Sequence, residues 1–266
     1  MVFIHNLDPV AFELFKIKIY WYSLAYLFGF IFSLFYAKLL IKKKLVKINF
    51  VIFEDFLGWA VLAVIFGGRL GYVIFYNLDF YISNPDKILK VWEGGMSFHG
   101  GLIGLILSIY FFSKIKKINF FELSNLVASC APFGIFLGRI ANFVNGELIG
   151  KPTNSNWGVL FKNNEVLRHP SQIYEACFEG LFIFLLINLA YRMKYQKFIN
   201  IFTIFLIMYG TFRFILEFFR EPDHQLGYIM MNLTMGQLLS IPMIIIGFIF
   251  LRYGKNERDS KLSKTK

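Results

Sequence analysis

The stretch IYWYSLAYLFGFIFSLFYAKLL, residues 19–40, has one charged side chain, Lys38. A bilayer core about 30 Å thick is crossed by a helix of roughly 20 apolar residues, so this stretch predicts a transmembrane helix. Six further stretches of the same kind follow along the chain. The predicted spans are about 19–40, 56–78, 94–113, 122–147, 174–191, 198–219 and 235–251.

The composition agrees with a membrane protein. Of the 266 residues, 57% are hydrophobic and 17% are charged, whereas about 25% of the residues in a soluble domain are charged. This excludes a disordered chain and argues against an ordinary water-soluble enzyme. We therefore expect an all-α integral membrane protein: one polytopic domain over residues 1–266, seven transmembrane helices, and a small extracytoplasmic cap built from residues 77–98 and 148–172.

The distribution of positive charge predicts the orientation. In a soluble protein a net charge of +11 would suggest nucleic acid, but here the basic residues cluster between the apolar stretches, so no nucleic-acid partner is expected. One set of alternate connections, with the C-terminal tail, holds 17 Lys and Arg, and the other set, with the N-terminus, holds eight. Because positively charged loops stay cytoplasmic, the N-terminus is predicted outside and the C-terminus inside.

Three groups of polar residues interrupt the spans. Residues 138–150 read GRIANFVNGELIG, and Arg139 and Asn142 share one helix face there. Tyr209, Arg213 and Glu217 are each four residues apart and stack on one side of their helix. Residues 94–101 place four glycines around His99, which suggests a turn that exposes the imidazole.

A charge at the bilayer centre costs at least about 2.5 kcal/mol, so such residues are functional candidates. In the predicted topology the following residues all lie in the outer halves of their spans: Arg139, Glu147, His99, Glu175, Arg213 and Glu217. Converging there, they would bind an anionic head group, with a histidine available for proton transfer.

Structural explanations compete with this interpretation. Arg213 and Glu217 have the spacing of a structural ion pair, and Arg69 could snorkel or pair with Asp55 or another helix. The segment around His99 could be a packed turn. The histidines and the two cysteines lack metal-ligand spacing, and no nucleotide-binding fingerprint is present, so no metal or cofactor is expected.

With these residues in view, the chain resembles the prolipoprotein diacylglyceryl transferase family. Residues 138–150 match the family's signature at every fixed position, and residues 209–223, YGTFRFILEFFREPD, are nearly as distinctive. The similarity also covers residues 20–26, 67–71, 94–101 and 169–175. One departure is Asn125, where many members carry Asp.

The resemblance implies an enzyme of the bacterial inner membrane. Its expected partners are phosphatidylglycerol, preprolipoprotein signal peptides with a lipobox cysteine, and the bilayer itself. The expected reaction transfers a diacylglyceryl group from the lipid to the cysteine thiol, forming a thioether and releasing glycerol 1-phosphate, as the first step of lipoprotein maturation.

The resemblance also implies roles for individual residues. His99 would act as base or proton relay, and Arg139 and Arg213 would hold the phosphate, a task that suits the bidentate guanidinium. Glu147 and Glu217 would orient the arginines. The residues expected to bind substrate are Tyr26, Arg139, Asn142, Glu147, Gly150, Tyr209 and Glu217.

Non-enzymatic functions predict other features. A transporter or channel for a small anion could use the same arginines for selectivity, but it would be expected to have repeat symmetry and a site at the midplane. The two halves of this chain show no resemblance to each other. A retinal-type photoreceptor needs a lysine in the last span, which residues 235–251 lack, and a structural scaffold would leave the intramembrane arginines unexplained.

Overall fold

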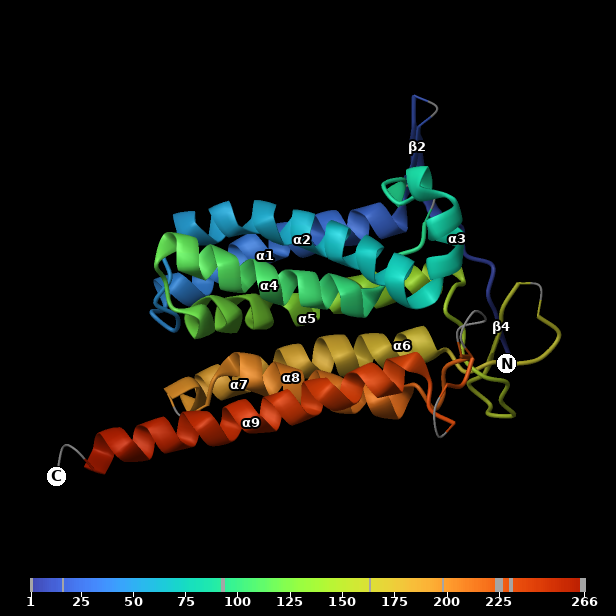
Figure 1. Ribbon diagram of the computed structural model, residues 1–266. Helices are drawn as coiled ribbons and strands as arrows, with labels where there is room; N and C mark the ends of the chain where they lie inside the picture. The colour runs from blue at the N-terminus through green and yellow to red at the C-terminus, as the bar shows by residue number, and fades with distance from the viewer. Residues whose placement is uncertain are drawn as a thin grey trace. The chain divides into compact units, whose positions relative to one another are not determined.

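The computed structural model describes residues 2–15, 17–91, 94–162, 164–197, 199–222, 227–229 and 232–263 (Figure 1). Its contacts divide the chain into two compact units: unit 1 is Met1–Tyr36 with Val127–Lys266, and unit 2 is Ala37–Leu126. In chain order the elements are β1 (Phe3–Ile4), β2 (Val10–Leu14), β3 (Ile17–Tyr20), α1 (Trp21–Lys42), α2 (Phe50–Tyr76), α3 (Leu78–Ser83), η1 (Pro85–Lys87), α4 (Phe98–Lys116), α5 (Phe120–Asn145), β4 (Val159–Leu160), α6 (Ser171–Glu175), η3 (Ala176–Phe182), α7 (Ile183–Arg192), η4 (Tyr195–Lys197), α8 (Ile201–Leu216) and α9 (Met235–Ser263).

Six helical stretches in the described chain are long and apolar enough to cross a membrane. They are α1, α2, α4, α5, the continuous stretch Ser171–Arg192 made of α6, η3 and α7, and the part Met235–Arg252 of α9. Helix α8, Ile201–Leu216, is apolar but shorter. These helices confirm the predicted all-α membrane fold, and the chain is a multi-pass membrane protein.

The helix bounds differ from the predicted spans for local reasons. Helix α2 begins at Phe50 instead of residue 56, because the Asn49 side chain accepts a hydrogen bond from the amide of Val51 and caps the helix. Helix α4 begins at Phe98 instead of residue 94, since Gly94 and Gly95 have φ angles of +85° and +77° that a helix cannot contain. The predicted start of the sixth span, Phe198, lies outside the described residues.

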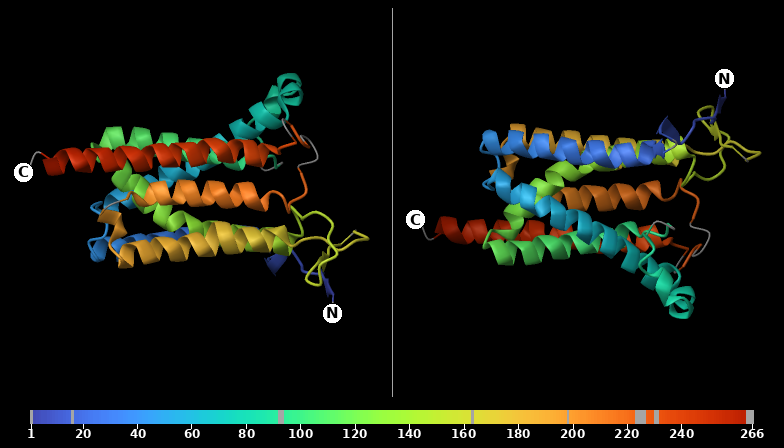
Figure 2. Two further views of the ribbon diagram at one scale, coloured as in Figure 1. Left: turned by 90° about the horizontal axis from the view of Figure 1, so that it is seen from below. Right: turned by 90° about the horizontal axis from the view of Figure 1, so that it is seen from above.

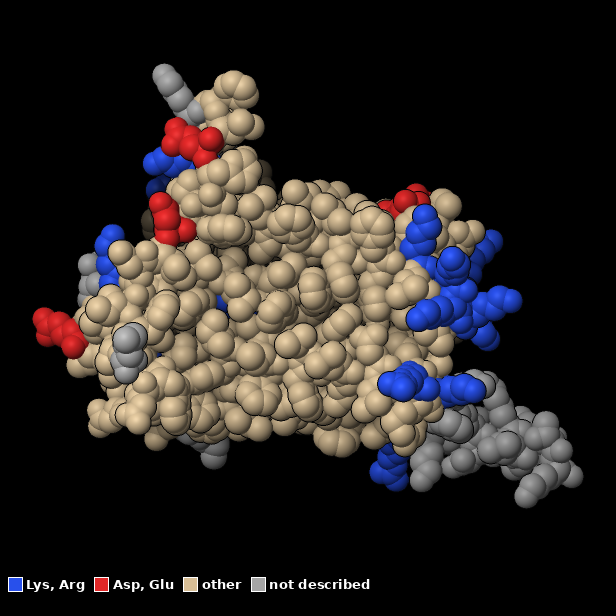
Figure 3. All heavy atoms as spheres, turned by 180° about the vertical axis from the view of Figure 1, so that it is seen from behind, with Lys and Arg blue, Asp and Glu red and all other residues tan. Residues whose placement is uncertain are grey.

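The surface of α2 shows where lipid would contact the protein. Leu62, Phe66, Leu70 and Ile74 recur every fourth residue, and each is 50–58% exposed. An exposed apolar stripe of this kind promotes aggregation in water, whereas it suits contact with the hydrocarbon core of a bilayer. Uncharged side chains make up most of the face drawn in Figure 3.

Two short strand pairs lie in unit 1. Strands β2 and β3 form an antiparallel hairpin, and β1 pairs in parallel with β4. Beside β1, the buried ring of His5 lies 2.6 Å from the carbonyl oxygen of Phe143, so the N-terminal strand is fixed to the end of α5.

Helices α8 and α9 of unit 1 lie side by side in both views of Figure 2. Their contact depends on small residues. A Cβ atom at Gly210 would lie 2.9 Å from Cγ1 of Ile244, and one at Gly247 would lie 2.5 Å from Cγ1 of Ile207. This packing brings the beginning of α9 against the end of α8.

In unit 2, Arg69 of α2 binds the backbone of the loop that precedes α4. Its guanidinium donates hydrogen bonds to the carbonyl oxygens of residues 87, 88, 90, 94 and 95. The alternative partner Asp55 instead pairs with Lys116 at 2.7 Å. Snorkelling and pairing with Asp55 are therefore wrong, because Arg69 is buried and Asp55 is engaged elsewhere. The alternative of another helix is confirmed: the guanidinium donates to the carbonyl oxygen of Lys87 in η1 and lies 5.1 Å from the centre of the Tyr81 ring on α3.

Helices α2 and α4 pack through glycines on both helices (Figure 1). A Cβ atom at Gly100 would lie 2.8 Å from the Cα atom of Gly71 and would collide with the carbonyl oxygen of Gly67. Each of these neighbours is backbone and cannot rotate away. The two helices can approach this closely only because neither has a side chain at the contact.

We therefore expect Gly100→Ala to lower the free energy of unfolding by about 1–3 kcal/mol, the usual cost of overpacking. A matched control is Gly58→Ala on α2, where a Cβ atom would meet nothing within 4 Å. That variant should be unchanged or more stable by up to about 1 kcal/mol. Thermal unfolding in detergent tests both, and equal midpoints for the two variants would contradict this packing.

Candidate functional site

Five charged residues of unit 1 form a buried arginine–glutamate cluster: Arg139, Glu175, Glu179, Arg213 and Glu217. Arg139, on α5, contacts Glu175 at 2.8 Å and Glu179 at 3.0 Å. Both glutamate side chains are 0% exposed, whereas that of Arg139 is 12% exposed. Arg139 is thus the most accessible member of the pairs it makes.

Arg213, on α8, approaches the same two glutamates from another helix. Its Nη1 lies 2.8 Å from Oε1 of Glu175 and 3.5 Å from Oε1 of Glu179. Its Nη2 lies 2.6 Å from Oε2 of Glu217, four residues further along the chain. The spacing of Arg213 and Glu217 predicts this last pair, and Glu217 contacts the arginine it was expected to orient.

The glutamates come from a helix with an irregular turn. Glu175 ends α6, and Glu179 lies in the π-helical segment η3 that continues it. Next to Glu179, Gly180 packs so closely on α5 that a Cβ atom would lie 2.6 Å from the Cα atom of Phe136. Single π turns are frequent at functional sites, and here the turn accompanies the close approach that lets both carboxylates meet Arg139.

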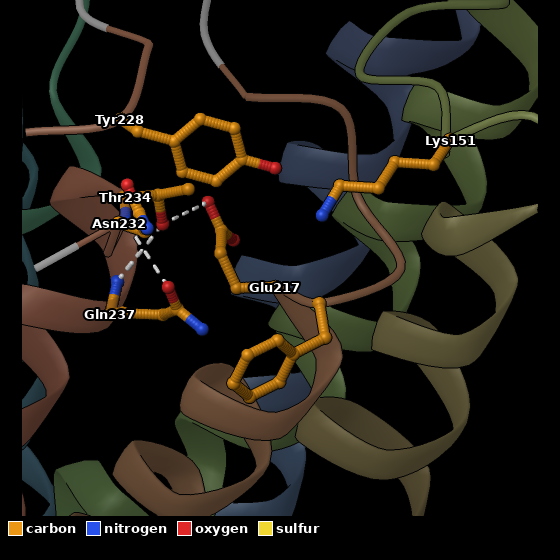
Figure 4. Close-up of a pocket in the computed structure, with 7 residues that line it drawn as sticks. Lys151, Glu217, Tyr228, Asn232, Thr234 and Gln237 are labelled. Atoms are coloured by element: carbon orange, nitrogen blue, oxygen red, sulfur yellow. Dashed lines mark hydrogen bonds between the residues drawn. The ribbon is translucent and has the colours of Figure 1, made fainter.

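The beginning of α9 supports Glu217. The Thr234 hydroxyl donates a hydrogen bond of 3.1 Å to Oε1 of Glu217, as Figure 4 shows. A Cβ atom at Gly236 would lie 2.8 Å from that same oxygen, so glycine is needed for the approach. Thr234 and Gly236 were not among the residues selected from the sequence, since nothing local marks their contact with a helix that ends 18 residues earlier.

The formal charges of the site balance. Arg220 is buried and interacts electrostatically with Glu175. With it, three arginines face three glutamates in apolar surroundings, where an unpaired charge would be costly. A further anion would bind here through guanidinium N–H groups that the carboxylates leave unengaged.

The signature segment forms a turn beside the cluster. Helix α5 ends at Asn145, and Gly146 follows with a φ angle of +66°, the left-handed conformation that commonly ends a helix. The Asn142 amide donates a 2.7 Å hydrogen bond to Oε1 of Glu147. Glu147 thus contacts an asparagine, whereas Glu175 and Glu179, which are absent from the predicted substrate-binding set, hold the arginines.

Three tyrosines lie near these residues. Tyr209 is fully buried and interacts electrostatically with Glu179 and Arg139. Tyr26 is about half exposed, and its hydroxyl lies 3.2 Å from that of Tyr22. Tyr22, which sequence reasoning missed, interacts in turn with Glu147 and Arg139.

Gly150 lies between two backbone segments. It forms an isolated bridge with Arg220, and its amide donates to the carbonyl oxygen of His169. A Cβ atom there would lie 2.8 Å from the carbonyl oxygen of Phe219, so the observed position explains the glycine by packing. Burial lowers the pKa of the neighbouring His169, which favours its neutral form.

His99 belongs to unit 2 and lies in the first turn of α4. The Ser97 side chain caps this helix by accepting from the amide of Gly100. The imidazole is buried, at 8% exposure, and meets the ring of Phe98 edge to face. The expectation of an exposed imidazole is therefore wrong: the turn at Gly94 and Gly95 leads into a capped helix, and the ring at its first turn is buried. Within the described residues, no group of three or more His, Cys, Asp or Glu side chains could hold a metal ion.

Comparisons with known proteins identify relatives over almost the whole chain. The family model described as prolipoprotein diacylglyceryl transferase matches residues 9–253. A protein of Rickettsia akari (strain Hartford) is 48% identical over 245 residues, which are 91% of this chain and 95% of the relative. One of Ehrlichia ruminantium (strain Gardel) is 48% identical over 255 residues, 94% of this chain and 98% of the relative. Both relatives are named phosphatidylglycerol--prolipoprotein diacylglyceryl transferase.

The bridging role of Glu175 predicts a large effect of its removal. Glu175→Gln would leave two guanidinium groups close together with one fewer buried counter-charge, and removing one partner of a buried pair costs about 3–5 kcal/mol. The variant should unfold at a clearly lower temperature than the parent chain. Glu165→Gln, at an exposed glutamate, is the control and should unfold with the parent. Equal melting of both variants would refute the bridging role.

Proposed function

This chain belongs to the prolipoprotein diacylglyceryl transferase family, and we propose that its buried arginine–glutamate cluster binds the phosphate of phosphatidylglycerol. The enzyme is a transferase that moves a diacylglyceryl group from phosphatidylglycerol to a prolipoprotein, the step that starts lipoprotein maturation. The acceptor in our proposal is the lipobox cysteine of a preprolipoprotein signal peptide.

The proposed reaction needs two kinds of help from the protein. The cysteine thiol loses its proton to a base. The sulfur then attacks the carbon of the diacylglyceryl group that is bonded to the phosphate oxygen. The carbon–oxygen bond breaks, its electron pair stays on the phosphate oxygen, and the products are a thioether and glycerol 1-phosphate. The site must therefore accept a proton and stabilise the charge that grows on the phosphate.

One observation carries the assignment of the phosphate site: a single carboxylate, that of Glu175, lies 2.8 Å from both Arg139 and Arg213. The glutamates hold two cationic groups together before any lipid arrives. Each guanidinium carries five N–H donors, more than its carboxylate partners engage. Donors fixed in this way stabilise developing charge without rearranging during the reaction.

The neighbouring polar residues would complete the lipid site. Asn142, held by Glu147, presents an amide next to the signature turn. Tyr209 contributes a hydroxyl from within the cluster, and Tyr26 contributes one from α1. We propose that these groups, with Glu147, Gly150 and Glu217, bind and orient the head group.

For the base we propose His99. Imidazole is the side chain whose ordinary pKa allows both uptake and release of a proton near neutral pH. The ring is buried and contacts that of Phe98 edge to face, which favours a positioned base over a mobile surface histidine. No protein nucleophile is required, because the acceptor supplies the sulfur.

We also propose the orientation and the membrane. The enzyme would lie in the bacterial inner membrane with the N-terminus outside, in agreement with 17 Lys and Arg in one set of connections against eight in the other. Cysteines introduced at the exposed lysines Lys162 and Lys47 test this. In intact spheroplasts an impermeant maleimide should label Lys162→Cys and spare Lys47→Cys, and the reverse pattern would contradict the orientation.

The transfer assay uses purified protein, phosphatidylglycerol labelled in its acyl chains, and lipobox peptides with Cys or Ser at the acceptor position. Label should move only to the Cys peptide. Arg139→Ala should reduce transfer by about 10²–10³-fold, as expected for the loss of a donor to developing charge. Arg139→Lys should recover little, because lysine lacks the fork of donors.

The same assay separates the base from the phosphate ligand. His99→Gln should impair transfer to the Cys peptide and be partly rescued by a selenocysteine peptide, whose selenol ionises more readily. Arg139→Ala should show no such rescue. Arg192→Ala, at an exposed arginine in the last turn of α7, controls for loss of charge alone. Full activity of Arg139→Ala would overturn the phosphate site, and full activity of His99→Gln would overturn the base.

A further inference from the structure

A cavity of about 360 Å³, lined mostly by residues with polar side chains, lies in unit 1, where α8 ends and α9 begins (Figure 4). This volume falls in the range of small-molecule sites. The residues that line it are Lys151, Glu217, Phe218, Tyr228, Asn232, Thr234 and Gln237. Apart from Phe218, each carries a hydrogen-bonding group.

Glu217 joins this cavity to the arginine–glutamate cluster. One of its carboxylate oxygens contacts Arg213 at 2.6 Å, and the other accepts the hydrogen bond from Thr234 at 3.1 Å in the cavity wall. The Glu217 carboxylate would thus lie between a group bound in the cavity and Arg213, which is proposed to bind the phosphate.

Four of the remaining lining residues suit a group with several hydroxyls. Tyr228, Asn232, Thr234 and Gln237 offer hydroxyls and amides, which both donate and accept hydrogen bonds. Lys151 supplies one ammonium group, 5.6 Å from the centre of the Tyr228 ring. Figure 4 shows the lysine pointing toward Tyr228 and Glu217. Among the described residues Lys151 makes no ion pair with a carboxylate.

We propose that this cavity binds the glycerol of the phosphoglycerol head group, first in the lipid and then in the released glycerol 1-phosphate. The inference rests on the proposed function. In the transfer reaction the bond that breaks joins the phosphate oxygen to the diacylglyceryl carbon, so the phosphate and the head-group glycerol leave together. When the phosphate contacts Arg213, its glycerol requires a nearby space with hydrogen-bonding groups, and the cavity on the other side of the Glu217 carboxylate supplies it.

The assignment makes the cavity a determinant of head-group specificity. A site that hydrogen-bonds a substrate hydroxyl rejects an analogue without it, because its own polar groups lose their partners. Phosphatidylethanol with matched acyl chains keeps the phosphodiester and lacks both hydroxyls. The parent enzyme should use it at least about tenfold less efficiently, in kcat/KM, than phosphatidylglycerol.

Variants of the cavity residues should reduce the preference for phosphatidylglycerol over phosphatidylethanol. Lys151→Gln and Tyr228→Phe should lower kcat/KM for phosphatidylglycerol while leaving the slower transfer from phosphatidylethanol nearly unchanged. Asn232→Gly is a suitable third variant, because Asn232 has a φ angle of +58° that glycine adopts without strain. Lys162→Gln, at an exposed lysine outside the cavity, is the matched control and should keep the parent's preference.

Inhibition by the free product distinguishes the glycerol from the phosphate. In Lys151→Gln the inhibition constant of glycerol 1-phosphate should rise about tenfold, and that of inorganic phosphate should stay unchanged. Equal weakening of both inhibitors would show that Lys151 holds phosphate, and would overturn the assignment. Equal losses on both lipids in all three cavity variants would show a structural role and would overturn it as well.

The controls separate this inference from the proposed function. If the parent protein transfers label from phosphatidylglycerol and the cavity variants keep its preference between the two lipids, only the glycerol site fails. If the folded parent protein transfers no label at all, the proposed function itself fails. Thermal unfolding of each variant identifies those that have lost the fold.

Discussion

The carboxylate of Glu175 lies between two guanidinium groups in the apolar interior of unit 1, and the surrounding structure preserves this contact. Arg139 comes from α5 and Arg213 from α8, so one acidic side chain links three helical segments. Charges buried among apolar residues must be paired and hydrogen-bonded. The helices that carry these charges cannot separate without exposing an uncompensated charge, which makes the proposed phosphate site rigid before the lipid binds.

Glycine at three positions makes this arrangement sterically possible. Gly180 brings the π-helical turn onto α5, Gly236 admits the carboxylate of Glu217 beside α9, and Gly150 fits between the backbone at His169 and at Phe219. In each case the nearest atom that a Cβ would meet belongs to the backbone or to a carboxylate that is already paired. Close approach of backbone therefore determines the geometry of the charged groups, and a methyl group at any of these positions would displace a member of the site.

Glu217 connects the chemistry to the recognition of the head group. It orients Arg213 with one oxygen and contributes to the cavity at the start of α9 with the other. In our proposal the two parts of one leaving group, phosphate and glycerol, occupy neighbouring sites that share this carboxylate. The specificity for the head group and the stabilisation of the leaving charge are then coupled through a single side chain.

Local sequence determined the parts of this protein that depend on helix geometry alone. Apolar length predicted the all-α membrane fold, the four-residue spacing predicted the pair of Arg213 with Glu217, and the signature placed Asn142 next to Arg139. Only the tertiary structure decided that Glu175 and Glu179 hold both arginines, that Thr234 supports Glu217, that Arg69 binds loop carbonyls, and that His99 is buried. Spacing along one helix follows from its fixed period. Partners on different helices depend instead on a π turn, on glycines with positive φ angles, and on close contacts that only glycine permits. These features bring together segments that are distant in the sequence.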